Sequence, residues 1–135
     1  MTAIIENNLS RNLTGENSLL RSQVFKMLPE ALANVPFHKN TDALTRYVAA
    51  GFPVHLAVHE VSSLLIPPAE YTQPQVHPEH DEINIILSDR RLSYRVQVGK
   101  EIFIVENNCS IWIPRGTMHS ANVLTGSGFF ITLRI

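Results

Sequence analysis

The side chains best suited to chemistry gather in two short segments of this chain, residues 75–82 and 114–119. The first segment contains His77 and Glu82, and the second ends at His119. Two imidazoles and one carboxylate form a facial ligand set that suits Fe(II), Mn(II), Ni(II) or Zn(II) and leaves positions open for water or substrate. These three residues therefore predict a site for a divalent transition metal.

The spacing within the first segment requires a change of chain direction. Side chains two residues apart share one face of a strand, so His77 and Glu82, which are five residues apart, cannot face the same side of a regular strand. A bend or bulge between Pro78 and Asp81 would let the imidazole and the carboxylate converge.

The elements that must position these side chains are short strands. From residue 52 onward, runs rich in Val, Ile and aromatic residues alternate with tight-turn pairs such as Gly99–Lys100. The predicted strands cover residues 54–61, 63–66, 82–87, 92–98, 101–105, 110–113, 119–124 and 129–135. Such strands without intervening helices predict a mostly β protein, an antiparallel sandwich or barrel.

The chain before residue 52 has a helical pattern. Apolar residues at helical spacing predict a helix over 19–28, and a short helical run over 30–34 follows Pro29. The cap pair Thr41 and Asp42 predicts another helix that ends at Gly51. We therefore expect two parts, a polar and helical N-terminal extension over 1–51 and a β-barrel domain over 52–135.

Strand phase nominates further interior side chains. If Glu82 points inward, Asn84 does too. On the strand predicted over 92–98, the face that carries Tyr94 has more apolar residues, so we expect that face to point inward. The Tyr94 phenol is then a candidate catalytic hydrogen-bond donor near a metal-bound substrate. His80 has three open interpretations: a metal ligand, a catalytic acid or base, or a surface residue.

The strand predicted over 54–61 also contains histidines. Its alternate face, with Val54, Leu56 and Val58, is the better core material, so His55 and His59 are expected to point outward or to an interface. Glu60 lies in phase with the apolar face, as a strand-end charge or a pocket carboxylate.

Length and composition exclude several classes of protein. The 135 residues suit one domain, and 44% hydrophobic against 17% charged residues excludes a disordered chain. A net charge of −1 argues against nucleic acid as a partner, and no apolar run approaches the ~20 residues of a membrane span. The single cysteine, Cys109, and an N-terminus unlike a signal peptide favour a cytoplasmic location.

The two histidine segments resemble the two sequence motifs of the cupin superfamily, and their local pattern is most similar to germin-type cupins. The resemblance rests on Gln75-x-His77-x4-Glu82-x6-Asp89 and on Pro114-x-Gly116-x2-His119, and it covers roughly residues 54–135. It implies a double-stranded β-helix, the jelly-roll cupin barrel. It also implies that His77, Glu82 and His119 are metal ligands.

One departure from the cupin pattern concerns the ligand set. Gln75 stands where the first motif has a metal-binding histidine. Gln75 can still ligate through its side-chain oxygen, and Gln-x-His-Pro also resembles a fragment of the zinc-dependent phosphomannose isomerases. Alternatively, His80 supplies the missing nitrogen.

The resemblance implies a metal-dependent enzyme that acts on a small oxygen-rich molecule, as a dioxygenase or as a lyase or isomerase. Two alternatives stay open. One is a non-catalytic cupin that binds a metal or small molecule. The other is a metal-independent dehydratase or epimerase in which His77 or His80 acts as acid or base. Cupins commonly pair, so a homodimer is expected.

Overall fold

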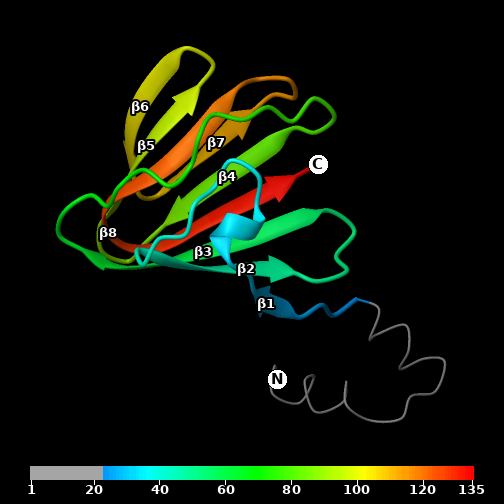
Figure 1. The fold of residues 1–135 in the computed structure, drawn as a ribbon, viewed down its shortest axis with the longest axis horizontal. Helices are drawn as coiled ribbons and strands as arrows, with labels where there is room; N and C mark the ends of the chain where they lie inside the picture. The colour runs from blue at the N-terminus through cyan, green and yellow to red at the C-terminus, as the bar shows by residue number, and fades with distance from the viewer. Residues whose placement is uncertain (1–22) are drawn as a thin grey trace, which may run out of the picture.

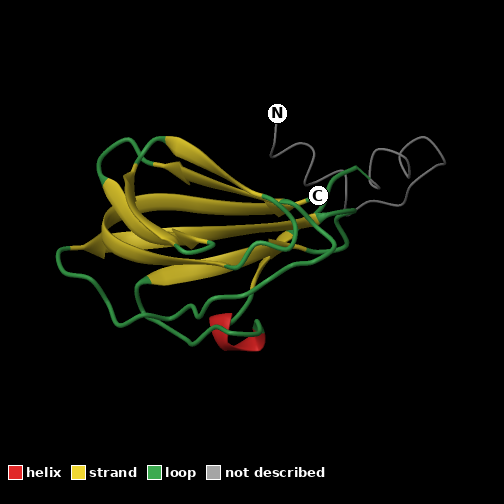
Figure 2. Cartoon of the chain, turned by 90° about the horizontal axis from the view of Figure 1, so that it is seen from above, coloured by secondary structure: helices red, strands yellow, loops and turns green. Residues whose placement is uncertain are grey.

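The computed structural model describes residues 23–135 as one twisted, antiparallel β structure (Figure 1). Its strands lie in two facing layers, and the short 3-10 helix η1 (Leu32–Asn34) lies outside them (Figure 2). The strands are β1 (Met27–Pro29), β2 (Leu44–Ala49), β3 (His55–Leu64), β4 (Glu82–Leu87), β5 (Leu92–Val98), β6 (Glu101–Glu106), β7 (Cys109–Ile113) and β8 (His119–Arg134). No helix among these residues is long and apolar enough to cross a bilayer.

The long strand β8 connects the two layers. Its first half pairs with β5, and its second half lies between β3 and β4 in the order β1-β2-β3-β8-β4-β7. The exchange of partners occurs at Gly126 and Gly128, both of which have positive φ. A Cβ at Gly126 would overlap the Arg91 carbonyl, so only glycine permits this crossing.

The core between the layers is apolar and closely packed. Ile86, Leu92 and Tyr94 are completely buried, and the Tyr94 ring stacks on Phe130 with 4.6 Å between ring centroids. Burial of each such side chain contributes about 1.5–3 kcal/mol to folding. Packing in this core fixes the positions of the strands whose ends carry the candidate site residues.

The predictions for the strands after residue 52 are confirmed, with two differences. The segments predicted over 119–124 and 129–135 are one continuous strand, β8, because the glycines between them continue the ladder rather than form a loop. Part of the segment predicted over 63–66 is the end of β3.

The helix predicted over 41–51 is wrong, because residues 44–49 form β2. This segment contains Thr45, Tyr47 and Val48, which favour strands, and pairing with β3 overrides the capping signal at Thr41. Of the helix predicted over 19–28, residues 19–22 lie outside the described residues, and the rest is wrong, because residues 23–26 are not helical and strand β1 begins at Met27. Since β1 and β2 pair into the sheet, that sheet crosses the predicted boundary at residue 52.

Candidate metal centre

Two strand ends and one loop bring the predicted metal ligands together. Glu82 is the first residue of β4, and His119 is the first residue of β8. His77 lies in the loop before β4, where a turn at Pro78–Glu79 supplies the bend that the sequence requires. The Gly116 amide donates to the His77 carbonyl at 2.9 Å, which ties this loop to the start of β8.

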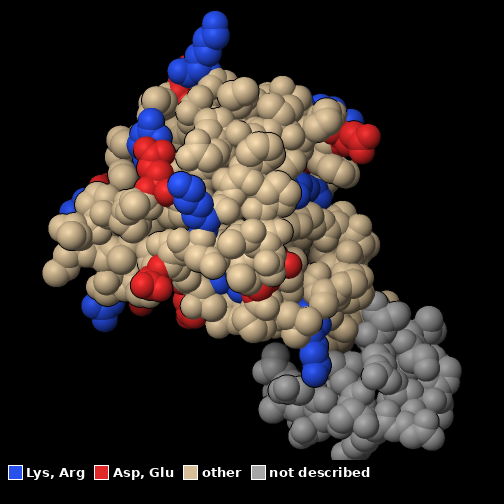
Figure 3. All heavy atoms as spheres, viewed as in Figure 1, with Lys and Arg blue, Asp and Glu red and all other residues tan. Residues whose placement is uncertain are grey.

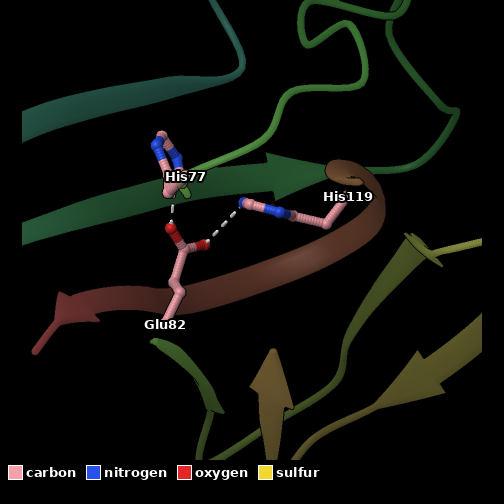
Figure 4. Close-up of side chains that lie close together, drawn as sticks. All are labelled: His77, Glu82 and His119. Carbon is pink, nitrogen blue, oxygen red and sulfur yellow. Dashed lines mark ion pairs between the residues drawn. The ribbon is translucent and has the colours of Figure 1, made fainter. Parts of the chain in front are cut away.

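The three side chains converge on one point. Nitrogen and oxygen atoms of His77, Glu82 and His119 lie within 4.8 Å of one another. Nε2 of His77 is 3.6 Å from Oε1 of Glu82, and Nε2 of His119 is 3.3 Å from Oε2. The carboxylate therefore faces both imidazole rings (Figure 4). Two ligands at about 2.1 Å from one ion are separated by no more than about 4.2 Å, and the distances of 3.6 and 3.3 Å satisfy this limit.

The chemistry of the donor atoms fits a cation. Nδ1 of His119 is 2.9 Å from the Thr117 carbonyl, which can only accept, so Nδ1 carries the proton in the neutral ring. Nε2 then presents a lone pair toward a carboxylate oxygen. Among the described residues, the buried Nε2 atoms of His77 and His119 have no hydrogen-bond partner. A metal ion between these atoms, or a proton on His119, resolves this arrangement.

The surroundings of Glu82 keep it ionised. The residue is 5% exposed, its Oε2 accepts from Asn84 Nδ2 at 2.9 Å, and its Oε1 accepts from Arg134 Nε at 3.2 Å. Burial raises the pKa of Glu82, but His119, Asn84 and Arg134 together outweigh it and lower the pKa to about 2. The carboxylate is therefore charged at neutral pH, as a ligand must be.

The two histidines respond differently to this environment. Burial and Arg134 lower the pKa of His77 to about 4, which leaves its imidazole neutral at pH 7. Burial lowers the pKa of His119 too, but Glu82 and the Thr117 carbonyl raise it by more. In the metal-free protein His119 and Glu82 thus favour an ion pair, and a metal would displace the proton of His119.

A cavity of about 30 Å³ adjoins Glu82 and His119. Its interior has room for one or two water-sized groups, and it is partly open to solvent. Its walls also include Arg46, His55, His59, Gln75, Thr132 and Arg134. Both ends of β8 reach it, although 16 extended residues would span about 50 Å. The crossing at Gly126 and Gly128 folds the strand back and makes this possible.

The outward orientation predicted for His55 and His59 is wrong. Both line the cavity, and His59 is 5% exposed, while Leu56 and Val58 are only half-buried. The positions of the apolar residues predicted the wrong interior face for β3, because the interior face of this strand lines a polar cavity. Glu60 is exposed on the opposite face and is not a pocket carboxylate.

The other predicted site residues have different surroundings. Gln75 lines the cavity and forms a two-way backbone bridge with His119 at 2.9 Å in each direction. Asn84 is buried beside Glu82, as predicted. His80 is exposed, and Tyr94 is buried in the core but is not among the residues that line the cavity.

Sequence reasoning missed two arginines. Arg46 is 6% exposed and lies on β2, the segment that was predicted to be helical. Arg134 lies directly across the β4–β8 ladder from Glu82. The strand-forming residues of 44–49 were the available signal for Arg46. The pairing that places Arg134 beside Glu82 has no local signal.

No protein-family model matches the chain, and no curated protein matches it. Three of the similar solved structures show the fold. A cupin superfamily protein from Desulfitobacterium hafniense has 12% identity and TM-score 0.54, covering 83% of this chain and 97% of its own. A predicted oxalate decarboxylase from Thermotoga maritima has 16% identity and TM-score 0.56, covering 83% and 97%. KdgF from Halomonas sp. has 17% identity and TM-score 0.53, covering 76% and 86%.

These similarities show that the chain has the cupin fold. The segments that resemble the two cupin motifs are those that meet at the His77–Glu82–His119 cluster.

Proposed function

We propose that this protein is a metal-dependent enzyme that acts on a small, oxygen-rich molecule. One observation carries the proposal: two buried imidazole nitrogens without partners among the described residues face the two oxygens of a buried carboxylate. Two imidazoles and one carboxylate suit Fe, Mn, Ni or Zn as divalent ions. Such a metal supplies a Lewis acid that polarises a substrate oxygen.

His77, Glu82 and His119 would hold the metal. Gln75 is the better placed of the two candidates for a fourth ligand, because it lines the cavity and its backbone pairs with His119. His80 is exposed, which supports a surface or substrate-contact role over ligation. Asn84 and Arg134 would fix the orientation of the Glu82 carboxylate through their hydrogen bonds.

Within this function we propose a lyase or isomerase rather than a dioxygenase. Lyases and isomerases need a group that moves a proton, and the cavity wall contains His55, whose Nε2 has no partner among the described residues. Burial and Arg134 lower the pKa of His55 to about 4, so its neutral ring can accept a proton at pH 7.

We also propose a cytoplasmic homodimer. The edge strand β6 supports the dimer, because it exposes Ile102, Phe103 and Ile104. Charged groups of both signs are interspersed on the face seen in Figure 3, most of which is uncharged. Light scattering after gel filtration tests the dimer: a mass of one chain contradicts it.

Elemental mass spectrometry of the freshly purified protein tests the metal. We expect about one transition-metal ion per chain, lost in both Glu82→Gln and His119→Ala. Glu79→Gln is the matched control, since Glu79 is an exposed carboxylate in the same loop. A wild-type protein that stays metal-free after anaerobic reconstitution overturns the proposal.

An oxygen electrode separates the reaction classes. The metal-loaded protein is screened against small hydroxy acids, keto acids and uronates, with and without O₂. We expect turnover that proceeds anaerobically and falls in His55→Gln. Turnover that consumes O₂ in proportion to product assigns a dioxygenase instead, and metal binding without turnover favours the non-catalytic alternative.

A further inference from the structure

The cavity has a second polar wall that the metal ligands do not use. It is formed by Arg46 on β2 with His55 and His59 on β3, and all three residues line the cavity. Arg46 and His59 are direct partners in the β2–β3 ladder, so their side chains emerge on the same face of the sheet. We call these three residues the Arg46 wall.

The contact between Arg46 and His59 determines which nitrogen of His59 carries its proton. Nη1 of Arg46 lies 3.2 Å from Nε2 of His59. A guanidinium can only donate, so Nε2 must accept and therefore carries no hydrogen. Burial and Arg46 lower the pKa of His59 to about 3, so the ring is neutral and its one proton is on Nδ1.

The Nδ1–H of His59 is a donor that lacks an acceptor. His59 is 5% exposed, and its buried Nδ1 has no hydrogen-bond partner among the described residues. An unsatisfied buried donor of this kind destabilises the folded protein. An oxygen atom of a ligand in the cavity would satisfy it.

The charge of the Arg46 wall favours an anion. Arg46 is 6% exposed, and its Nε donates to Oε1 of Glu30 at 3.1 Å, which orients the guanidinium. Glu30 itself is one-third exposed, so it neutralises Arg46 only in part. Nε2 of His55 is a further buried nitrogen without a partner among the described residues. The wall thus combines the Arg46 cation, the neutral Nδ1–H donor of His59 and the Nε2 of His55, which has no partner among the described residues.

We propose that the Arg46 wall binds a carboxylate group of the substrate, with Arg46 and the Nδ1–H of His59 as its donors. The inference rests on the proposed function for its second half: the substrate would place another oxygen at the metal centre. The substrate class is then a small hydroxy acid, keto acid or dicarboxylate. A carboxylate offers two acceptor oxygens, one for each of these donors.

The first test uses the wild-type, metal-stripped protein and needs no substitution. Long-range ¹H–¹⁵N correlation spectra report the tautomer of each histidine. We expect His59 to be protonated at Nδ1, and we expect its ¹⁵N resonances to shift saturably as malonate is added. A ring protonated at Nε2, or no shift with malonate, overturns the proposal.

The second test measures malonate affinity by calorimetry on the same metal-stripped protein. We expect at least tenfold weaker binding in Arg46→Gln and in His59→Leu, with unchanged binding in Arg91→Gln. Arg91 is the matched control because it is an exposed arginine that also pairs with a glutamate. Circular dichroism verifies folding, and the wild-type spectra decide the question if Arg46→Gln does not fold.

Two further arms separate the sources of a positive result. Inorganic phosphate that binds as tightly as malonate contradicts carboxylate selectivity, and malonamide that binds equally contradicts recognition of an anion. Glu82→Gln separates this proposal from the proposed function. If the metal site fails but the carboxylate subsite is correct, malonate still shifts His59 in protein that binds no metal.

Discussion

Substitution of Glu82 by glutamine tests the electrostatics of the candidate metal centre in the metal-free protein. The amide is close in shape to a protonated carboxyl, so Glu82→Gln mimics the protonated state at every pH. The pKa of Glu82 is lowered from 4.5 to about 2. At about 1.36 kcal/mol per pKa unit, this shift corresponds to about 3 kcal/mol of folding free energy.

The sign of the pH dependence follows from the direction of the shift. Because the folded pKa lies below the unfolded one, the stabilisation is fully present above pH 4.5 and is lost as the pH falls through about 2. We therefore expect Glu82→Gln to be about 3 kcal/mol less stable than the wild type at pH 7. At pH 3 that difference shrinks to about 1 kcal/mol.

Urea unfolding of EDTA-treated protein at pH 7, 5, 4 and 3 measures this difference. Glu60→Gln is the control, because Glu60 is exposed on β3 and its removal should change stability by less than about 0.5 kcal/mol. A difference between Glu82→Gln and the wild type that is the same at all four pH values would refute the reasoning. Added Zn²⁺ or Mn²⁺ should raise the melting temperature of the wild type alone.

Three other substitutions test how the site is built. Asn84→Leu removes the donor to Glu82 Oε2, and we expect metal affinity to fall about 10–100-fold. Competition with a chelating dye measures this affinity, and an unchanged value contradicts the role of Asn84 in orienting Glu82. Gly126→Ala should lower the melting temperature by more than 10 °C or prevent folding, because the added Cβ would overlap the Arg91 carbonyl. A calorimetric scan that matches the wild type would be inconsistent with the β8 crossing. Tyr94→Phe should leave kcat/KM within twofold, because Tyr94 is a core residue outside the cavity wall, and a tenfold loss would restore the catalytic role predicted from the sequence.

Local pattern was sufficient to select the residues of the candidate metal centre. His77, Glu82 and His119 were predicted from residue type and motif spacing, and the structure places their donor atoms within 4.8 Å. Asn84 was predicted from the alternation of a strand, and it is buried against Glu82. The Asn84 prediction succeeds because side chains two residues apart share a face of a strand, whatever that strand packs against.

Pairing between distant strands decided the rest of the cavity. Helix-start signals precede residues 44–49, whereas the residues within this segment favour a strand. Pairing with β3 selects the strand. The same pairing brings Arg46 beside His59, and the β4–β8 register brings Arg134 beside Glu82. A one-residue change in either register would turn these side chains to the opposite face.

The sequence by itself thus determined the mostly β fold after residue 52 and the three candidate metal ligands, because both depend on short-range periodicity and residue chemistry. Only the tertiary structure decided that His55 and His59 face inward and that two arginines join them. Apolar side chains do not mark the interior of a strand where that interior is a polar cavity. The cavity exists only when β2, β3, β4 and β8 have assembled around it.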